Sequence, residues 1–189
     1  MKRSSRNRLT EKELFLFPGD TLFDKLGRTV CKAGCLPRKE LFEAWEVARR
    51  VRRRFRGGRI VDLACGHGLT AAILLLLDDS SPQALAIDRS IPPSAQKLHA
   101  SLLEAWPRLD QRIEFLQSPI EKVTLNADDL VVSVHACGNL TDVVIDLAIT
   151  ARARLAVLPC CHNLAESDQG SLNGWLEETM AVDVTRANQ

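Results

Sequence analysis

From Arg59 onward, the chain alternates between short apolar runs and stretches with helical periodicity. Five apolar runs have the length and composition of buried strands and lie at residues 59–64, 84–88, 112–117, 129–135 and 155–159. Helical patterns lie between or after them, at residues 69–77, 94–106, 141–150 and 172–180. Strands joined by right-handed helical crossovers form a mostly parallel sheet with helices on both faces. We therefore expect an α/β fold with a doubly wound, Rossmann-like sheet.

The residues before this alternation carry most of the positive charge. Residues 1–60 hold 17 Lys and Arg against 7 Asp and Glu, a balance of +10, whereas residues 61–189 hold 8 against 17, a balance of −9. Residues 1–10 are polar and basic and predict a loosely held arm, and a helical pattern follows from Pro37 to about Phe55. We therefore expect a basic N-terminal extension with a helix over residues 1–58 and a core over residues 59–189.

Two features of the sequence predict where the chain is located and how many strands its sheet has. The longest apolar stretch, Leu69 to Leu77, is too short to span a bilayer, and no apolar signal segment follows the basic start. We therefore expect no membrane partner and a cytoplasmic location, where the six cysteines stay reduced. The sequence stops before a sixth or seventh strand is complete, which predicts a sheet that is short or lacks its last strands.

A glycine-containing turn follows the first predicted strand. Asp62-Leu-Ala-Cys-Gly66-His-Gly68 stands where this strand passes into the first helix, and the glycines let backbone N–H groups approach a ligand there. The same residues also fit the dinucleotide pattern G-x-G-x-x-A, because Ala71 follows Gly68 by three positions. An enzyme that uses NAD is therefore one interpretation of the turn.

Two aspartates bear on which cofactor could bind at this turn. Asp62 precedes Gly66 by four residues, and a carboxylate there suits a cationic amino-acid group better than a pyrophosphate. Asp88 ends the second predicted strand, where a carboxylate can accept both ribose hydroxyls of a nucleoside. Asp88 is compatible with either cofactor, so Asp62 makes the distinction, and it favours S-adenosylmethionine (SAM). The predicted cofactor-binding residues are Asp62, Ala64, Cys65, Gly66, Gly68, Asp88, Gln117 and Ser118.

Two further blocks end the fourth and fifth predicted strands at the same edge of the sheet. The first runs from His135 through Cys137-Gly138 to Leu140-Thr-Asp142, and the second is Cys160-Cys161-His162. Together with the glycine turn, they resemble a Rossmann-like (class I) SAM-dependent methyltransferase group with H-x-C-G-x-L-T-D and C-C-H motifs. That group includes a family of tRNA ribose 2′-O-methyltransferases. The resemblance covers roughly residues 59–164 and implies SAM binding and methyl transfer, with RNA as one acceptor.

The chain departs from the tRNA enzymes in its N-terminal part, which lacks their cysteine and histidine zinc module and has only the pair Cys31 and Cys35. The tRNA substrate therefore does not carry over directly. In the predicted transfer site, His135, Asp142 and His162 are alternative general bases for a hydroxyl or amine acceptor. Cys160 and Cys161 are expected to shape the acceptor cavity, since vicinal cysteines seldom both reach one tetrahedral zinc, and no metal site is predicted.

A basic segment, Arg49–Arg59, contains seven arginines and precedes the first predicted strand. Phosphate backbones favour such clusters, so this segment is a candidate RNA contact. The chain has no tyrosine and only nine aromatic residues, which limits stacking of unpaired bases. Three alternatives remain open: a small-molecule methyltransferase, a non-catalytic RNA-binding or scaffold module on this fold, and an NAD oxidoreductase.

Overall fold

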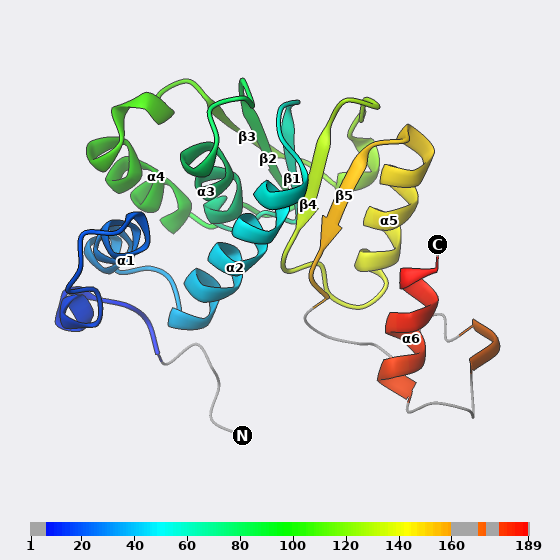
Figure 1. Cartoon of the computed structure of the whole chain (residues 1–189), viewed down its shortest axis with the longest axis horizontal. Coiled ribbons are helices and arrows are strands. Elements are labelled where there is room, and N and C mark those ends of the chain that lie inside the picture. Colours follow the sequence, from blue (N-terminus) through cyan, green and yellow to red (C-terminus); the bar gives the residue numbers. More distant parts are fainter. Residues whose placement is uncertain (1–6, 160–169, 173–177, 189) are drawn as a thin grey trace.

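The computed structural model describes residues 7–159, 170–172 and 178–188 (Figure 1). The strands are β1 (Ile60–Leu63), β2 (Ala84–Asp88), β3 (Ile113–Gln117), β4 (Leu130–Ser133) and β5 (Arg154–Val157). The α-helices are α1 (Leu22–Ala33), α2 (Arg38–Arg54), α3 (Leu69–Leu77), α4 (Ser94–Ala105), α5 (Leu140–Ala151) and α6 (Glu178–Ala187). Short 3-10 helices are η2 (Glu11–Leu16), η3 (Pro107–Leu109), η4 (Ile120–Lys122) and η5 (Gly170–Leu172).

The five strands form one parallel sheet in the order β3-β2-β1-β4-β5. Strand β1 lies between β2 and β4. Strands β2 and β3 are added on one side of β1, and β4 and β5 on the other, so the order of the strands reverses between β1 and β4. The carboxyl ends of all strands meet at the lower edge in Figure 1, where ligands bind in sheets of this kind. The α/β, doubly wound, Rossmann-like fold is confirmed.

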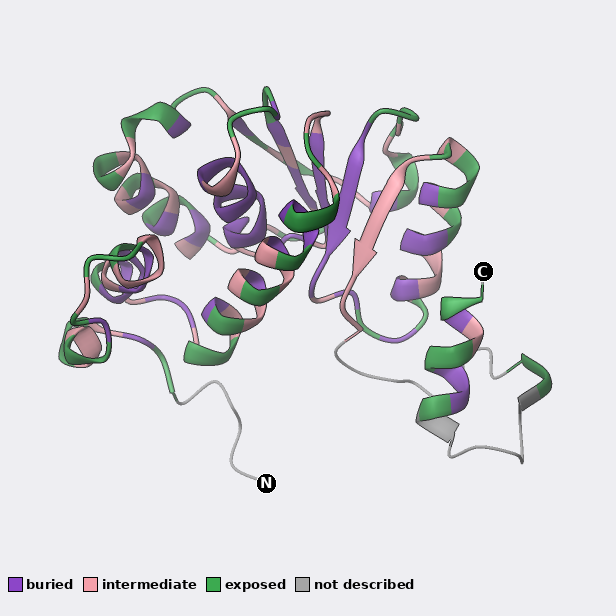
Figure 2. Cartoon of the chain, in the orientation of Figure 1, coloured by how far each residue is buried: buried purple, intermediate pink, exposed green. Residues whose placement is uncertain are grey.

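Helices cover both faces of the sheet because strand residues alternate between two cores (Figures 1 and 2). Ile60 packs into a core with residues of α2, α3 and α4, whereas the next residue, Val61, packs into a second core with residues of α5. Helix α3 is apolar apart from Thr70, and each of its residues from Leu69 to Leu76 is buried. A helix hydrophobic all round belongs in the interior, as α3 does between the sheet and α2.

The N-terminal extension packs on this core. Phe17, which follows η2, is 2% exposed, and its ring approaches Gly27 of α1 so closely that a Cβ there would lie 2.3 Å from it. Helix α1 packs on α4 and helix α2 on α3. The N–H of Leu9 donates to Leu36 and the N–H of Arg38 donates to Asn7. The prediction of a loosely held arm is therefore wrong for residues 7–10.

The C-terminal part differs from its prediction in position. The helix predicted over residues 172–180 and α6 share residues 178–180, and α6 continues to Ala187; residues 173–177 lie outside the described ranges. Residues Asp183 to Ala187 form the second half of α6. No helix in the described part of the chain combines the length and apolarity needed to cross a membrane.

Two arginines of the basic segment, Arg52 and Arg59, stabilise the fold. Arg52 is 5% exposed; its Nε donates to the carbonyl of Leu74 and its Nη2 to Ser81 Oγ. Its Nη1 lies 3.4 Å from a carboxylate oxygen of Asp78. Arg59 forms two hydrogen bonds with the Asp129 carboxylate, at 3.0 and 2.7 Å. Arg52 therefore ties α2 to α3 and the loop after it, and Arg59 ties the start of β1 to that of β4.

The variant Arg52→Ala is expected to lower the free energy of unfolding by about 3 kcal/mol, because it removes two buried hydrogen bonds and the cation beside Asp78. Arg53, the next residue of α2, is exposed, and Arg53→Ala should change that free energy by less than about 0.5 kcal/mol. Urea unfolding followed by circular dichroism measures both. Equal midpoints for the two variants would contradict a structural role for Arg52.

Candidate active site

The glycine turn between β1 and α3 has a left-handed backbone at three positions. Ala64, Gly66 and Gly68 have φ values of 58°, 52° and 70°. Gly68 is the N-cap residue of α3 and has no room for a side chain, since a Cβ there would lie 2.7 Å from the Phe115 ring. A Cβ on Gly66 would meet no atom within 4 Å, so this residue faces open space. The lack of a side chain at Gly68 thus lets the Phe115 ring pack against the turn, and the lack of one at Gly66 leaves open space beside it.

The Asp88 carboxylate at the end of β2 joins the glycine turn to the next loop. One oxygen accepts the N–H of Gly66 at 2.9 Å, and the other accepts the N–H of Ser90 at 3.0 Å. Two backbone donors on one carboxylate fix its position at the carboxyl edge of the sheet. This arrangement places Asp88 beside the turn, on the neighbouring strand.

Two adjacent cavities open at this edge and share Ala64, Asp88 and Leu140. The first has a volume of about 420 Å³ and its other lining residues are Arg89, Pro119, Ile120, Glu121, Asn139 and Val143. The second has a volume of about 350 Å³ and its other lining residues are Glu40, Ala44, Cys65, Gly66, His67, Leu69, Thr70, Pro92 and His135. We call them the β3-side cavity and the glycine-turn cavity. Of the predicted cofactor residues, Ala64, Cys65, Gly66 and Asp88 line one or both.

Asp62 lies beneath the turn and lines neither cavity. It is 1% exposed, and one carboxylate oxygen accepts the N–H of Ala71 at 3.2 Å. Burial raises the pKa of Asp62 to about 7, the Ala71 hydrogen bond lowers it, and the charge of Asp88 adds to the rise. The structure thus gives this carboxylate a role in supporting the start of α3.

Gln117 and Ser118 also lie outside the two cavities. Gln117 lines a separate cavity of about 340 Å³ with His99 and Phe115, on the α4 side of the sheet. Ser118 donates its N–H to the carbonyl of Asp88 and its hydroxyl to that of Pro119. The next residues, Pro119 to Glu121, line the β3-side cavity in their place.

Among the residues that the structure describes, two histidines face the glycine-turn cavity. His135 follows β4, and His67 stands between the two glycines of the turn. His67 Nε2 lies 2.9 Å from Ser94 Oγ, and its Nδ1 lies 3.8 Å from a carboxylate oxygen of Glu40. Burial lowers the pKa of both histidines, so both are neutral at pH 7. Sequence reasoning missed His67 and Glu40; the only signal for Glu40 was an acidic residue in a basic helix.

Asp142 in the first turn of α5 is engaged in an ion pair. Arg186 of α6 contacts both of its carboxylate oxygens, at 2.6 and 3.0 Å, and donates to the carbonyl of Gly138 at 2.8 Å. The Thr141 hydroxyl donates to the carbonyl of Ala136. These contacts hold the loop that follows His135.

Cys160, Cys161 and His162 lie outside the described residues.

The basic segment Arg49–Arg59 lies at the far end of the domain from the two cavities. Glu40 and Ala44, near the start of α2, line the glycine-turn cavity, whereas the end of α2 leads to the amino end of β1. The 17 residues of α2 span about 25 Å. Figure 1 shows α2 rising from the carboxyl edge of the sheet to the opposite edge.

A family model described as a methyltransferase domain matches residues 40–168, more than half of the chain. The chain belongs to this methyltransferase domain family. The match includes β1 to β5 and the glycine turn, and it begins at Glu40 of α2. The turn, the Asp88 carboxylate and both cavities therefore belong to a methyltransferase domain.

Curated relatives also match part of this chain. The human and Xenopus laevis glutathione S-transferase C-terminal domain-containing proteins are 30% and 32% identical to this chain over 115 residues. The matched region is 59% of this chain and 17% of those proteins, so the chain spans about a sixth of their length.

Two solved structures of methyltransferases are also similar to this chain. The SAM-dependent methyltransferase SibL has a TM-score of 0.48 and 20% identity, over 82% of this chain and 47% of that chain. The B. subtilis tRNA methyltransferase TrmK has a TM-score of 0.49 and 15% identity, over 65% of this chain and 51% of that chain.

The pKa of Asp62 has a consequence for stability. Because it is about 7 in the folded chain against an ordinary 3.8, the folded chain binds more protons than the unfolded chain between these pH values. The contribution of this group is complete below about pH 4 and is lost as the pH rises through about 7. The free energy of unfolding of wild type, relative to Asp62→Asn, should therefore fall by up to about 4 kcal/mol over this range. Urea titrations at several pH values measure this difference, and one that is independent of pH would contradict the assignment.

Proposed function

We propose that the chain is a SAM-dependent methyltransferase whose cofactor lies across the β3-side and glycine-turn cavities. The observation that carries this proposal is the meeting of the two cavities at Asp88, directly beside the glycine turn. A nucleoside joined to an amino acid is elongated and needs two connected compartments. A carboxylate between them suits the ribose hydroxyls, which donate hydrogen bonds to it.

The residues present fit the two ends of SAM. The β3-side cavity presents Pro119, Ile120, Leu140 and Val143, an apolar wall of the kind that holds a flat base. The glycine-turn cavity presents Gly66, where any side chain would occupy the open space. SAM, when bound, supplies an electrophilic methyl group for transfer to a nucleophile.

The structure favours His135 as the acceptor of the proton that the nucleophile releases. His135 lines the glycine-turn cavity and is neutral at pH 7, because burial lowers its pKa. His67 has its Nε2 beside Ser94 Oγ, and both oxygens of Asp142 are bonded to Arg186. Of these three side chains, His135 is therefore the general base of this proposal.

Calorimetric titration with S-adenosylhomocysteine tests the cofactor assignment. The wild-type chain should bind it, and Asp88→Ala should weaken binding by about 100-fold, because the ribose hydroxyls and the N–H groups of Gly66 and Ser90 lose their acceptor. Asp146→Ala, which removes an exposed carboxylate from α5, is the matched control and should leave binding unchanged. A folded wild-type chain without affinity would overturn the proposal and favour a non-catalytic module on this fold.

The His135→Asn variant tests the general base once a screen of RNA pools and metabolites has provided an acceptor. Loss of this base should lower kcat by about 100-fold or more while S-adenosylhomocysteine affinity stays within about threefold. Since the pKa of His135 is lowered, the wild-type rate should fall only as the pH drops below about 6.5, and the variant should lack this limb. An unchanged kcat would show that another group takes the proton.

A further inference from the structure

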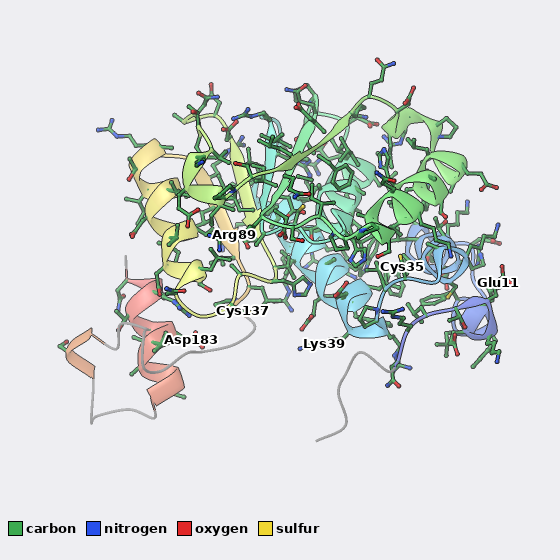
Figure 3. The ribbon with its side chains drawn as sticks, turned by 180° about the vertical axis from the view of Figure 1, so that it is seen from behind. Glu11, Cys35, Lys39, Arg89, Cys137 and Asp183 are labelled. Carbon is green, nitrogen blue, oxygen red and sulfur yellow. The ribbon has the colours of Figure 1, made fainter. Side chains whose placement is uncertain are left out.

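An exposed patch of three cations and one aromatic ring lies beside the glycine-turn cavity. We call it the α2-start patch; it consists of Asn7, Arg8, Arg38, Lys39 and Phe42, all exposed. Two surface hollows of about 430 and 330 Å³ share Asn7 and Arg38. Figure 3 shows Lys39 at the foot of α2, on the same edge of the molecule as Cys137 of the loop after β4.

The cations of the patch come from two segments that the backbone holds together. Arg8 and Pro37 form an antiparallel bridge, and the N–H of Arg38 donates to the carbonyl of Asn7 at 3.0 Å. The N–H of Leu9 donates to the carbonyl of Leu36 at 2.8 Å, and Leu9 is 1% exposed. Arg8 is therefore fixed beside the start of α2, where Arg38 and Lys39 follow.

Phe42 gives the patch an aromatic surface with a defined orientation. Its side chain is 43% exposed, which is high for a phenylalanine. The Phe23 ring packs against it edge to face, with centroids 5.2 Å apart and planes at 73°. The guanidinium of Arg38 lies over the Phe42 ring, 5.8 Å from its centroid. An exposed ring with a guanidinium over it offers a nucleobase two flat groups on which to stack.

The patch adjoins the residues proposed for methyl transfer. Lys39 precedes Glu40, which lines the glycine-turn cavity with His67 and His135. Burial is the main reason why the pKa of both histidines is lowered. The positive charge of Arg8 lowers the pKa of His67 further, and that of Lys39 lowers the pKa of His135. A chain bound along the patch would thus reach the cavity that contains both histidines.

We propose that the α2-start patch binds single-stranded nucleic acid and presents it to the glycine-turn cavity as the methyl acceptor. Arg8, Arg38 and Lys39 contact phosphates, and Phe42 stacks on a base. An acidic peptide would use the cations but not the ring. The proposal rests on the proposed methyltransferase function and differs from RNA binding through Arg49–Arg59, a segment at the other end of α2.

The test is fluorescence anisotropy with a labelled single-stranded RNA of about 10 nucleotides. Release of about three counterions predicts binding about 20-fold weaker at 200 mM than at 50 mM salt. The double variant Arg38→Ala/Lys39→Ala should weaken binding and make it less salt-dependent, because it removes two of the three cations. Phe42→Ala should weaken binding at least about fivefold with the salt dependence unchanged.

The matched control is Arg53→Ala/Arg54→Ala, which removes the same charge from exposed positions at the other end of α2 and should leave binding within about twofold. A control that weakens binding as much as the patch variants would place the RNA at Arg49–Arg59 and overturn the proposal. Competition by an acidic peptide equal to that by unlabelled RNA would also overturn it. Calorimetry with S-adenosylhomocysteine separates the two proposals: a chain that binds it but not RNA refutes the patch alone, and a chain that does not bind it refutes the methyltransferase function.

Discussion

The pair of hydrogen bonds that Asp88 accepts from Gly66 and Ser90 is the interaction on which the site depends. The two donors belong to loops after different strands, and one carboxylate fixes both loops at the carboxyl edge of the sheet. Parallel pairing of β1 with β2 brings the carboxylate to this place, because Asp88 is one residue past the register pair Leu63 and Ile87. The two cavities meet at this carboxylate, and both are lined by Ala64, Asp88 and Leu140.

Much of the fold could be predicted because local patterns determine it. The helix predicted at residues 69–77 is α3 residue for residue, and the strand at 84–88 is β2, since both are short apolar runs between clear breaks. The side-chain roles were harder to predict because they depend on faces and distant partners. Gln117 points to the α4 side with Phe115, since strand residues two apart share a face. The partner of Asp142 is Arg186, 44 residues away on a helix whose bounds were predicted differently.

The distribution of charge along the sequence also fails to show which residues come together in the folded chain. Counted along the sequence, the arginines of residues 49–59 form the most basic cluster, yet Arg52 and Arg59 form internal ion pairs with Asp78 and Asp129. The α2-start patch was not visible as a cluster because Arg8 and Arg38 are 30 residues apart in sequence. Folding brings them together through backbone hydrogen bonds beside the cavity. The α2-start patch and the segment Arg49–Arg59 therefore differ in their position relative to the cavities. A count of charges along the sequence does not show this difference.

The central claim is that one cofactor occupies both cavities and passes the Asp88 carboxylate between them. The most direct measurement is a crystal structure of the chain grown with S-adenosylhomocysteine. The account predicts one continuous ligand, with its base against Ile120 and Val143, its ribose hydroxyls on Asp88 and its amino-acid end beside Gly66. A ligand bound elsewhere, or confined to one cavity without contact to Asp88, would contradict it.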